Sequence, residues 1–192
     1  GVVATGAGTS AGEMVVGSNT SDTLIGNGGV DRFSAGGGND TIVLTTSDVT
    51  NLAAGTGNYR STVDGGAGYD MIRLSGGASL DLTSISNTDA MAGDGSSRIS
   101  SIERIDLATD TAANTLTVTA KDINDLTGMN LLHTGSVSAD EQTWTNTSGS
   151  PFNTAPPYHQ LVVEGTSTDK VVVTDAYDVR STLPDPVSID MN

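Results

Sequence analysis

The sequence predicts an all-β fold: a parallel β-roll of short stacked turns that continues into a β-rich part with long irregular loops and one or two short helices. Three consecutive nine-residue segments, 17–25, 26–34 and 35–43, share early glycines or small residues, an Asp at position six and an apolar residue at position eight. A fourth copy stands at 65–73. Val, Ile, Leu and Thr dominate the apolar and β-forming positions, which favours strands over helices.

The spelling of this repeat indicates a metal site. Its first six residues must make a tight turn, and glycine permits backbone conformations that a Cβ forbids. Such turns aim carbonyl oxygens inward, and the Asp at position six adds a carboxylate. Calcium prefers about 6–8 oxygen ligands at roughly 2.3–2.6 Å, and the pattern is that of the calcium-binding nonapeptide. We therefore expect several calcium ions, bound by Asp22, Asp31, Asp40 and Asp70 with the turn residues Gly17, Gly26, Gly28, Gly36, Gly38 and Gly65.

The last three residues of each repeat form a short strand whose central side chain points inward. These central residues are Leu24, Phe33, Ile42 and Ile72. A single turn cannot bury such a side chain, so the turns must stack. Because successive repeats lie on alternate sides of the roll, we expect Asp22 and Asp40 to close one calcium site. Asp31 and Asp70 need partners from elsewhere.

The composition narrows the class of protein. The 192 residues carry 23 acidic and 8 basic side chains, a formal charge of −15, which argues against nucleic acid and anionic membranes as partners. Bound cations would relieve this repulsion, so their binding energy would also be folding energy. There are no cysteines, and neither a membrane-spanning stretch nor a signal peptide is visible. The chain begins Gly-Val-Val, and we expect it to be a module of a longer protein.

The remaining elements follow from local patterns. We expect one domain over 1–192, with roll turns at 17–73 and a β-rich ligand-binding part at 74–183. Val15 and Val16 form a strand that caps the first turn, and residues 47–52 and 121–128 form short helices. Further strands are expected in MIRL, SLDLTSI, RISSIERIDL and NTLTVT, and then at 160–164 and 170–174.

The repeats, followed by SLDLTSI, RISSIERIDL and NTLTV, resemble the C-terminal modules of giant bacterial RTX adhesins, which leave the cell by type I secretion. The chain is most similar to the peptide-binding domain of ice-binding members of that group. The resemblance implies a secreted, cell-surface module, monomeric within a larger adhesin, that acts in cell adhesion and biofilm formation. It also implies that calcium takes part in gripping the free C-terminal end of a peptide on another cell.

Two acidic loops are candidates for an exposed calcium that accepts a ligand carboxylate. One contains Asp89, Gly93, Asp94, Gly95 and Ser96, with Arg98 beside it, and the other contains Asp106, Asp110 and Asn114. Either loop could equally hold a closed calcium or cap turns without metal, and Arg98 could pair with a neighbouring acid. Trp144 and Tyr158 lie in the irregular stretch 134–160, where they could wall a groove or fill a minor core.

We do not expect an enzyme. Residues 8–12 match G-x-S-x-G, but no helix pattern follows Ser10 as a nucleophile elbow requires. His133 and His159 are isolated. Two alternatives to peptide binding remain: a calcium-dependent carbohydrate-binding module, with Trp144 as an aromatic platform, and a structural or secretion spacer without a ligand.

Overall fold

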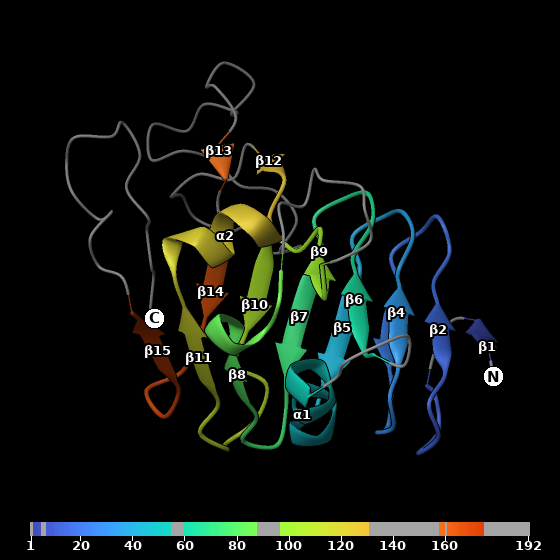
Figure 1. Ribbon diagram of the computed structural model, residues 1–192, viewed down its shortest axis with the longest axis horizontal. Coiled ribbons are helices and arrows are strands. Elements are labelled where there is room, and N and C mark those ends of the chain that lie inside the picture. The colour runs from blue at the N-terminus through green and yellow to red at the C-terminus, as the bar shows by residue number, and fades with distance from the viewer. Residues whose placement is uncertain are drawn as a thin grey trace.

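Parallel sheets dominate the computed structural model, which describes residues 2–4, 7–54, 60–87, 97–130, 158–159 and 161–174. The first sheet has the order β1 (Val2–Ala4), β2 (Met14–Val16), β4 (Arg32–Ser34), β6 (Thr62–Asp64) and β9 (Ile99–Ser100). The second has the order β14 (Val162–Glu164), β10 (Arg104–Asp106), β7 (Met71–Leu74), β5 (Thr41–Leu44) and β3 (Thr23–Ile25). Strands of the two sheets run in opposite directions, because the chain alternates between the sheets from β2 to β7 (Figure 1).

A third parallel sheet extends the roll, with the order β15 (Lys170–Val173), β11 (Thr115–Val118) and β8 (Ser79–Asp81). β12 (Met129–Asn130) and β13 (Tyr158–His159) form a separate antiparallel pair. No helix in the described residues is long and apolar enough to cross a membrane.

Apolar side chains at the strand centres form continuous ladders through the interior. In the second sheet Leu24 is in register with Ile42, Ile42 with Ile72, and Ile72 with Ile105. In the first sheet the ladder comprises Val15, Phe33, Val63 and Ile99, and in the third it comprises Leu80, Leu116 and Val171. All but the partly buried Val171 lie in the buried core. Stacking thus buries what no single turn could bury.

Two α-helices and one short 3-10 helix interrupt the strands. α1 (Thr46–Ala54) replaces the short turn between β5 and β6, and it lies at the lower edge of the roll, midway along the stack of strands (Figure 1). Its Val49 and Leu52 are buried. α2 (Ala120–Leu126) begins with a capping box between Thr119 and Asp122. η1 (Leu82–Ser84) follows β8 directly.

Most sequence-based expectations for the fold agree with this architecture. The predicted inward residues Leu24, Phe33, Ile42 and Ile72 are buried, and the sheets of the roll are parallel with two helices. Two boundaries differ. The segment expected only to cap the roll adds β1 and a turn before β2, so the roll begins earlier than residue 17. It also continues past residue 73, because β10 and β14 extend the same sheet.

Close stacking leaves no room for a Cβ at some turn glycines. Gly66 has a φ of +91°, and a Cβ there would lie 2.1 Å from the carbonyl oxygen of Gly36 in the neighbouring turn. A Cβ at Gly128 meets nothing within 4 Å.

We therefore predict that Gly66→Ala lowers the free energy of unfolding by roughly 2–4 kcal/mol, through backbone strain and the clash with the next turn. The control Gly128→Ala should change it by less than about 1 kcal/mol. Urea denaturation in calcium measures both values, and equal effects of the two substitutions would contradict the stacking described here.

Candidate calcium sites in the turns

Four acidic residues lie in successive turns along one edge of the roll, just before the strands of the second sheet begin. They are here called the Asp70 column: Asp22, Asp40, Asp70 and Glu103. The backbone amides of the first three each donate to the carboxylate of the next turn, whereas the amide of Glu103 donates to the backbone carbonyl of Asp70. The amide of Asp22 donates to Oδ1 of Asp40 at 2.7 Å, and the amide of Asp40 donates to Oδ1 of Asp70 at 2.8 Å. The amide of Asp70 donates to Oε2 of Glu103 at 2.9 Å. The expected neighbours Asp22 and Asp40 therefore adjoin, and Asp70 obtains its second partner from Glu103.

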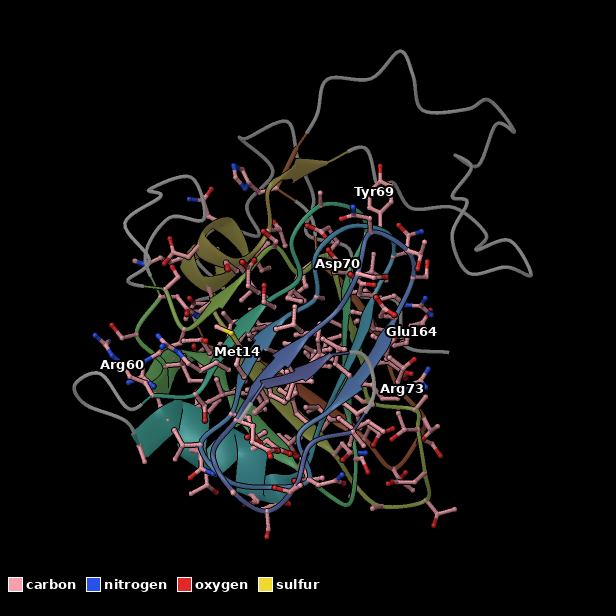
Figure 2. The ribbon with its side chains drawn as sticks, turned by 90° about the vertical axis from the view of Figure 1, so that its right-hand side faces the viewer. Met14, Arg60, Tyr69, Asp70, Arg73 and Glu164 are labelled. Atoms are coloured by element: carbon pink, nitrogen blue, oxygen red, sulfur yellow. The ribbon has the colours of Figure 1, made fainter. Side chains whose placement is uncertain are left out.

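Two of these four residues have a carboxylate oxygen without a partner, whereas Oδ2 of Asp22 accepts from the amide and hydroxyl of Ser18. Oδ2 of Asp40 and Oδ2 of Asp70 are buried and accept no hydrogen bond from the residues that the structure describes. A Cβ on Gly65 would lie 2.8 Å from Oδ2 of Asp70, so only glycine leaves this oxygen space. In Figure 2 Tyr69 stands at the outer end of its turn, and Asp70 lies within the fold beside it.

Burial makes three of these carboxyl groups, on Asp40, Asp70 and Glu103, unusually weak acids. Burial, together with the neighbouring Glu103, Asp40 and Asp64, raises the pKa of Asp70 to about 7. Burial likewise raises the pKa of Glu103 to about 6 and raises the pKa of Asp40. A buried carboxylate without a compensating charge is costly, so this column favours a cation among its oxygens.

A shorter series of turn residues, here called the Asp31 column, lies along the opposite edge, just before the strands of the first sheet begin. In it Glu13 precedes Asp31, and Ser61 follows Asp31. The amide of Glu13 donates to Oδ1 of Asp31 at 2.9 Å, repeating the geometry of the Asp70 column. Oδ2 of Asp31 is buried and has no hydrogen-bond partner in the described part of the chain. Burial, together with the nearby carboxylates of Asp48 and Glu13, raises the pKa of Asp31 to about 6.

A third column links its turns by the same kind of hydrogen bond, but each of its side-chain oxygens has a hydrogen-bond partner. The amide of Ala78 donates to Oδ1 of Asn114 at 3.0 Å, and the amide of Asn114 donates to Oδ1 of Asp169 at 2.9 Å. Oδ2 of Asp169 accepts from the amide and hydroxyl of Thr166. Asn114, expected as a calcium ligand, therefore holds two turns together with its neutral amide.

The other two members of that expected set also have protein partners. Asp106 forms an ion pair with Arg73 at 3.1 Å. Asp110 accepts hydrogen bonds from the amides of Gly76 and Ala112, which lower its pKa. A calcium held jointly by Asp106, Asp110 and Asn114 stays a prediction: protein hydrogen bonds account for each of these side chains, and Asn114 adjoins Asp110.

Calcium fits the first two columns on the evidence of their unpartnered oxygens. Within the described ranges, no three His, Asp or Glu side chains are arranged as a metal-binding cluster. Calcium in these turns must therefore combine one or two carboxylates with turn carbonyls, which suits its preference for many oxygen ligands. The positive φ angles of Gly28, Gly36 and Gly38 belong to the turns that would offer those carbonyls.

The structure describes only some of the residues that we expected to contact the ligand. Asp89, Gly93, Asp94, Gly95, Ser96 and Trp144 lie outside the described residues, as does the side chain of Tyr158. Arg98 is buried, and its Nη1 donates to the carbonyl of Leu52 at 3.0 Å, near the C-terminal end of α1. This position does not support the ligand-binding role expected for Arg98. His159 contacts the carbonyl of Thr127 through Nδ1 at 2.7 Å.

Three acidic residues were missed in the sequence: Glu13, Asp48 and Glu103. Glu13 stands nine positions before Asp22, in a repeat whose Glu replaces Asp, so the nine-residue spacing alone could have identified it. The match of residues 8–12 to G-x-S-x-G is the turn of this repeat, and β2 follows it where a nucleophile elbow needs a helix. Asp48 and Glu103 have no such signal, because an inserted helix and a non-repeat segment carry them.

Comparison with known families identifies the turns between residues 8 and 42. Residues 8–42 match the family model of the RTX calcium-binding nonapeptide repeat, in four copies. The chain carries RTX calcium-binding repeats. The match includes the copy that begins at Gly8, and such repeats indicate a calcium-binding secreted protein. No curated protein and no solved structure matches the chain.

We predict that Asp70→Asn reduces the rise in melting temperature that calcium produces. The substitution keeps the hydrogen bond from the Asp40 amide but removes the charge from the centre of the Asp70 column. The control Asp125→Asn removes a carboxylate that pairs with Lys121 on α2, outside the columns, and should leave the calcium effect unchanged. Thermal melts over a calcium titration measure the difference, and an unaltered response in Asp70→Asn would argue against calcium in this column.

The raised pKa values also predict how acidity affects the calcium-free protein. Between the ordinary carboxyl pKa of 3.8 and the folded values of about 6 for Asp31 and about 7 for Asp70, the folded chain binds more protons than the unfolded chain. Its free energy of unfolding should therefore fall as the pH rises from about 4 to about 7. With saturating calcium this fall should be reduced, since the ion favours the ionised carboxylates.

Melting of metal-stripped protein in metal-free buffers between pH 5 and pH 8 tests this dependence. A stripped protein that melts at the same temperature across this range would contradict the assignment of buried, uncompensated carboxyl groups.

Proposed function

We propose that this chain is an extracellular, calcium-dependent adhesion module that binds a peptide or protein C-terminus on another cell, with an exposed calcium helping to grip the carboxylate. Calcium would first complete the roll and so give the non-repeat segments a fixed base. The binding surface would then be formed by those segments, and the module would act as a monomer within a larger adhesin.

The observation that carries this proposal is the continuity of the Asp70 column. Glu103 belongs to RISSIERIDL, the segment that resembles RTX adhesins, yet its carboxylate accepts from the amide of Asp70 in a repeat. The calcium turns and the adhesin-like segment therefore share one hydrogen-bonded column. Calcium bound at the turns would stabilise both together.

The base of the acidic insertion at 88–96 gives further support. Oδ1 of Asn87 accepts from the amides of Arg98 at 3.0 Å and Ile99 at 2.9 Å, so one side chain joins the two ends of the insertion. Loops with fixed ends on a rigid framework are common places for binding residues. Asp89, Asp94 and Ser96 lie in this insertion.

Charge explains why calcium would be needed at the surface as well as in the turns. A chain of formal charge −15 repels a free carboxylate unless a bound cation reverses the local field. Calcium with an open coordination position accepts a carboxylate oxygen directly. The proposal requires no catalytic group, and we propose that the module is not an enzyme.

Binding to immobilised peptides tests the proposal. A peptide with a free C-terminus should bind in calcium, and either amidation of that end or a chelator should weaken binding at least ten-fold. Binding unaffected by both treatments would overturn the proposed mode. Retention on a glycan array without peptide binding would favour the carbohydrate alternative, and calcium-driven folding with no ligand would favour a structural spacer.

A further inference from the structure

The Asp31 column changes character after its second turn. β4 and β6 pair with Arg32 opposite Thr62, so Ser61 follows Asp31 where a regular repeat would place another Asp. Ser61 is buried, and its hydroxyl has no hydrogen-bond partner among the described residues. The turn before β6 has been replaced by a longer segment that contains α1. The column therefore lacks its third regular carboxylate.

Helix α1 supplies a carboxylate at this place. Oδ2 of Asp48, in the first turn of α1, accepts from the amide of Thr45 at 2.8 Å and from its hydroxyl at 2.7 Å. These bonds fix the carboxyl group. Its other oxygen, Oδ1, is buried and accepts no hydrogen bond from any described residue, and the whole residue is only 3% exposed.

The unpartnered oxygens of Asp31 and Asp48 face the same small space. A Cβ on Gly26 would lie 2.5 Å from Oδ2 of Asp31 and 3.1 Å from Oδ1 of Asp48. Asp31 is 1% exposed, and its Oδ1 is fixed by the amide of Glu13. The remaining oxygens of two buried carboxylates thus lie near the same point beside Gly26, with Cζ of Phe33 2.9 Å from it, and two such oxygens close together are costly without a cation.

The helix is also held against this turn directly. The side-chain amide of Asn51, one turn of α1 beyond Asp48, donates to the carbonyl of Gly29 in the turn that ends at Asp31. The turn and the helix therefore keep a fixed relation, as a site shared between them requires.

We propose that the turn 26–31 and helix α1 share a calcium ion, ligated by Oδ2 of Asp31 and Oδ1 of Asp48. Turn carbonyls and water complete the shell, since calcium accepts such mixed, irregular oxygen sets. This site is not formed between two nonapeptides. It couples the inserted helix to the roll, so that α1 docks when calcium binds. The inference rests on the calcium-binding function proposed for the chain, and it adds a site that the repeat pattern does not predict.

Asp48→Asn tests the site, because the amide keeps an oxygen for Thr45 and removes the charge. Asp122→Asn is a matched control: Oδ2 of Asp122 accepts from the amide of Thr119 at 2.8 Å and from its hydroxyl at 2.7 Å, as in α1. Asp122 does not have the buried, unpartnered oxygen that distinguishes Asp48.

Isothermal titration of metal-stripped protein with calcium counts the ions. We expect Asp48→Asn to bind one ion fewer than the wild type, Asp122→Asn to bind the same number, and Asp31→Asn/Asp48→Asn to lose no more than Asp31→Asn alone. Wild-type stoichiometry in Asp48→Asn, or a further ion lost in the double variant, would overturn the inference. A wild type that binds no calcium would instead overturn the proposed function.

A crystal structure of the wild type grown with calcium tests the site even where a variant fails to fold. Anomalous density between the carboxylates of Asp31 and Asp48 is the expected result, and its absence beside calcium-filled repeat turns would overturn the shared site.

Discussion

The fold depends on burying carboxylates in register. Most turns that carry the repeats place an acidic side chain where the amide of the preceding turn can donate to it, and this bond links one turn to the next. Only one oxygen of each buried Asp is used in this way at Asp31, Asp40 and Asp70. The same stacking that buries the apolar ladders therefore accumulates negative charge away from water. Each added turn contributes both apolar burial and repulsion between carboxylates. A bound divalent cation would offset the repulsion and leave the apolar burial unchanged.

The third column shows what the roll looks like without this conflict. Asn114 occupies the position of an acid there, and the oxygens of Asn114 and Asp169 all accept hydrogen bonds. The strands around it, β8, β11 and β15, form their own parallel sheet with a buried apolar ladder. We therefore expect dependence on metal to be uneven along the chain, concentrated between β2 and β10 and weaker toward β15. Calcium withdrawal should first affect the part that carries the repeats.

The repeated part of the fold could be predicted because its signal is periodic. Nine-residue spacing identified the strands around Leu24, Phe33 and Ile42, and the side of the roll on which each Asp lies. Glu13 was missed only because Glu replaced Asp and the early glycines were diluted. Asp48 and Glu103 could not be found in this way, since each reaches its column from a segment with no fixed spacing from the repeats. Arg98 shows what charge alone does not reveal: it suggested a ligand or surface partner, whereas the side chain is buried and its Nη1 donates to the carbonyl of Leu52 in α1.

The closure of the segment 88–96 by Asn87 has a practical consequence. The side chain of Asn87 already ties Arg98 and Ile99 to the start of this segment. The free energy of closing a loop between such tied ends changes only slowly with the length of the loop. The position is thus a natural graft point. Foreign epitopes or altered recognition sequences inserted there would leave the registers of β8 and β9 intact, and the roll would serve as a calcium-locked display scaffold.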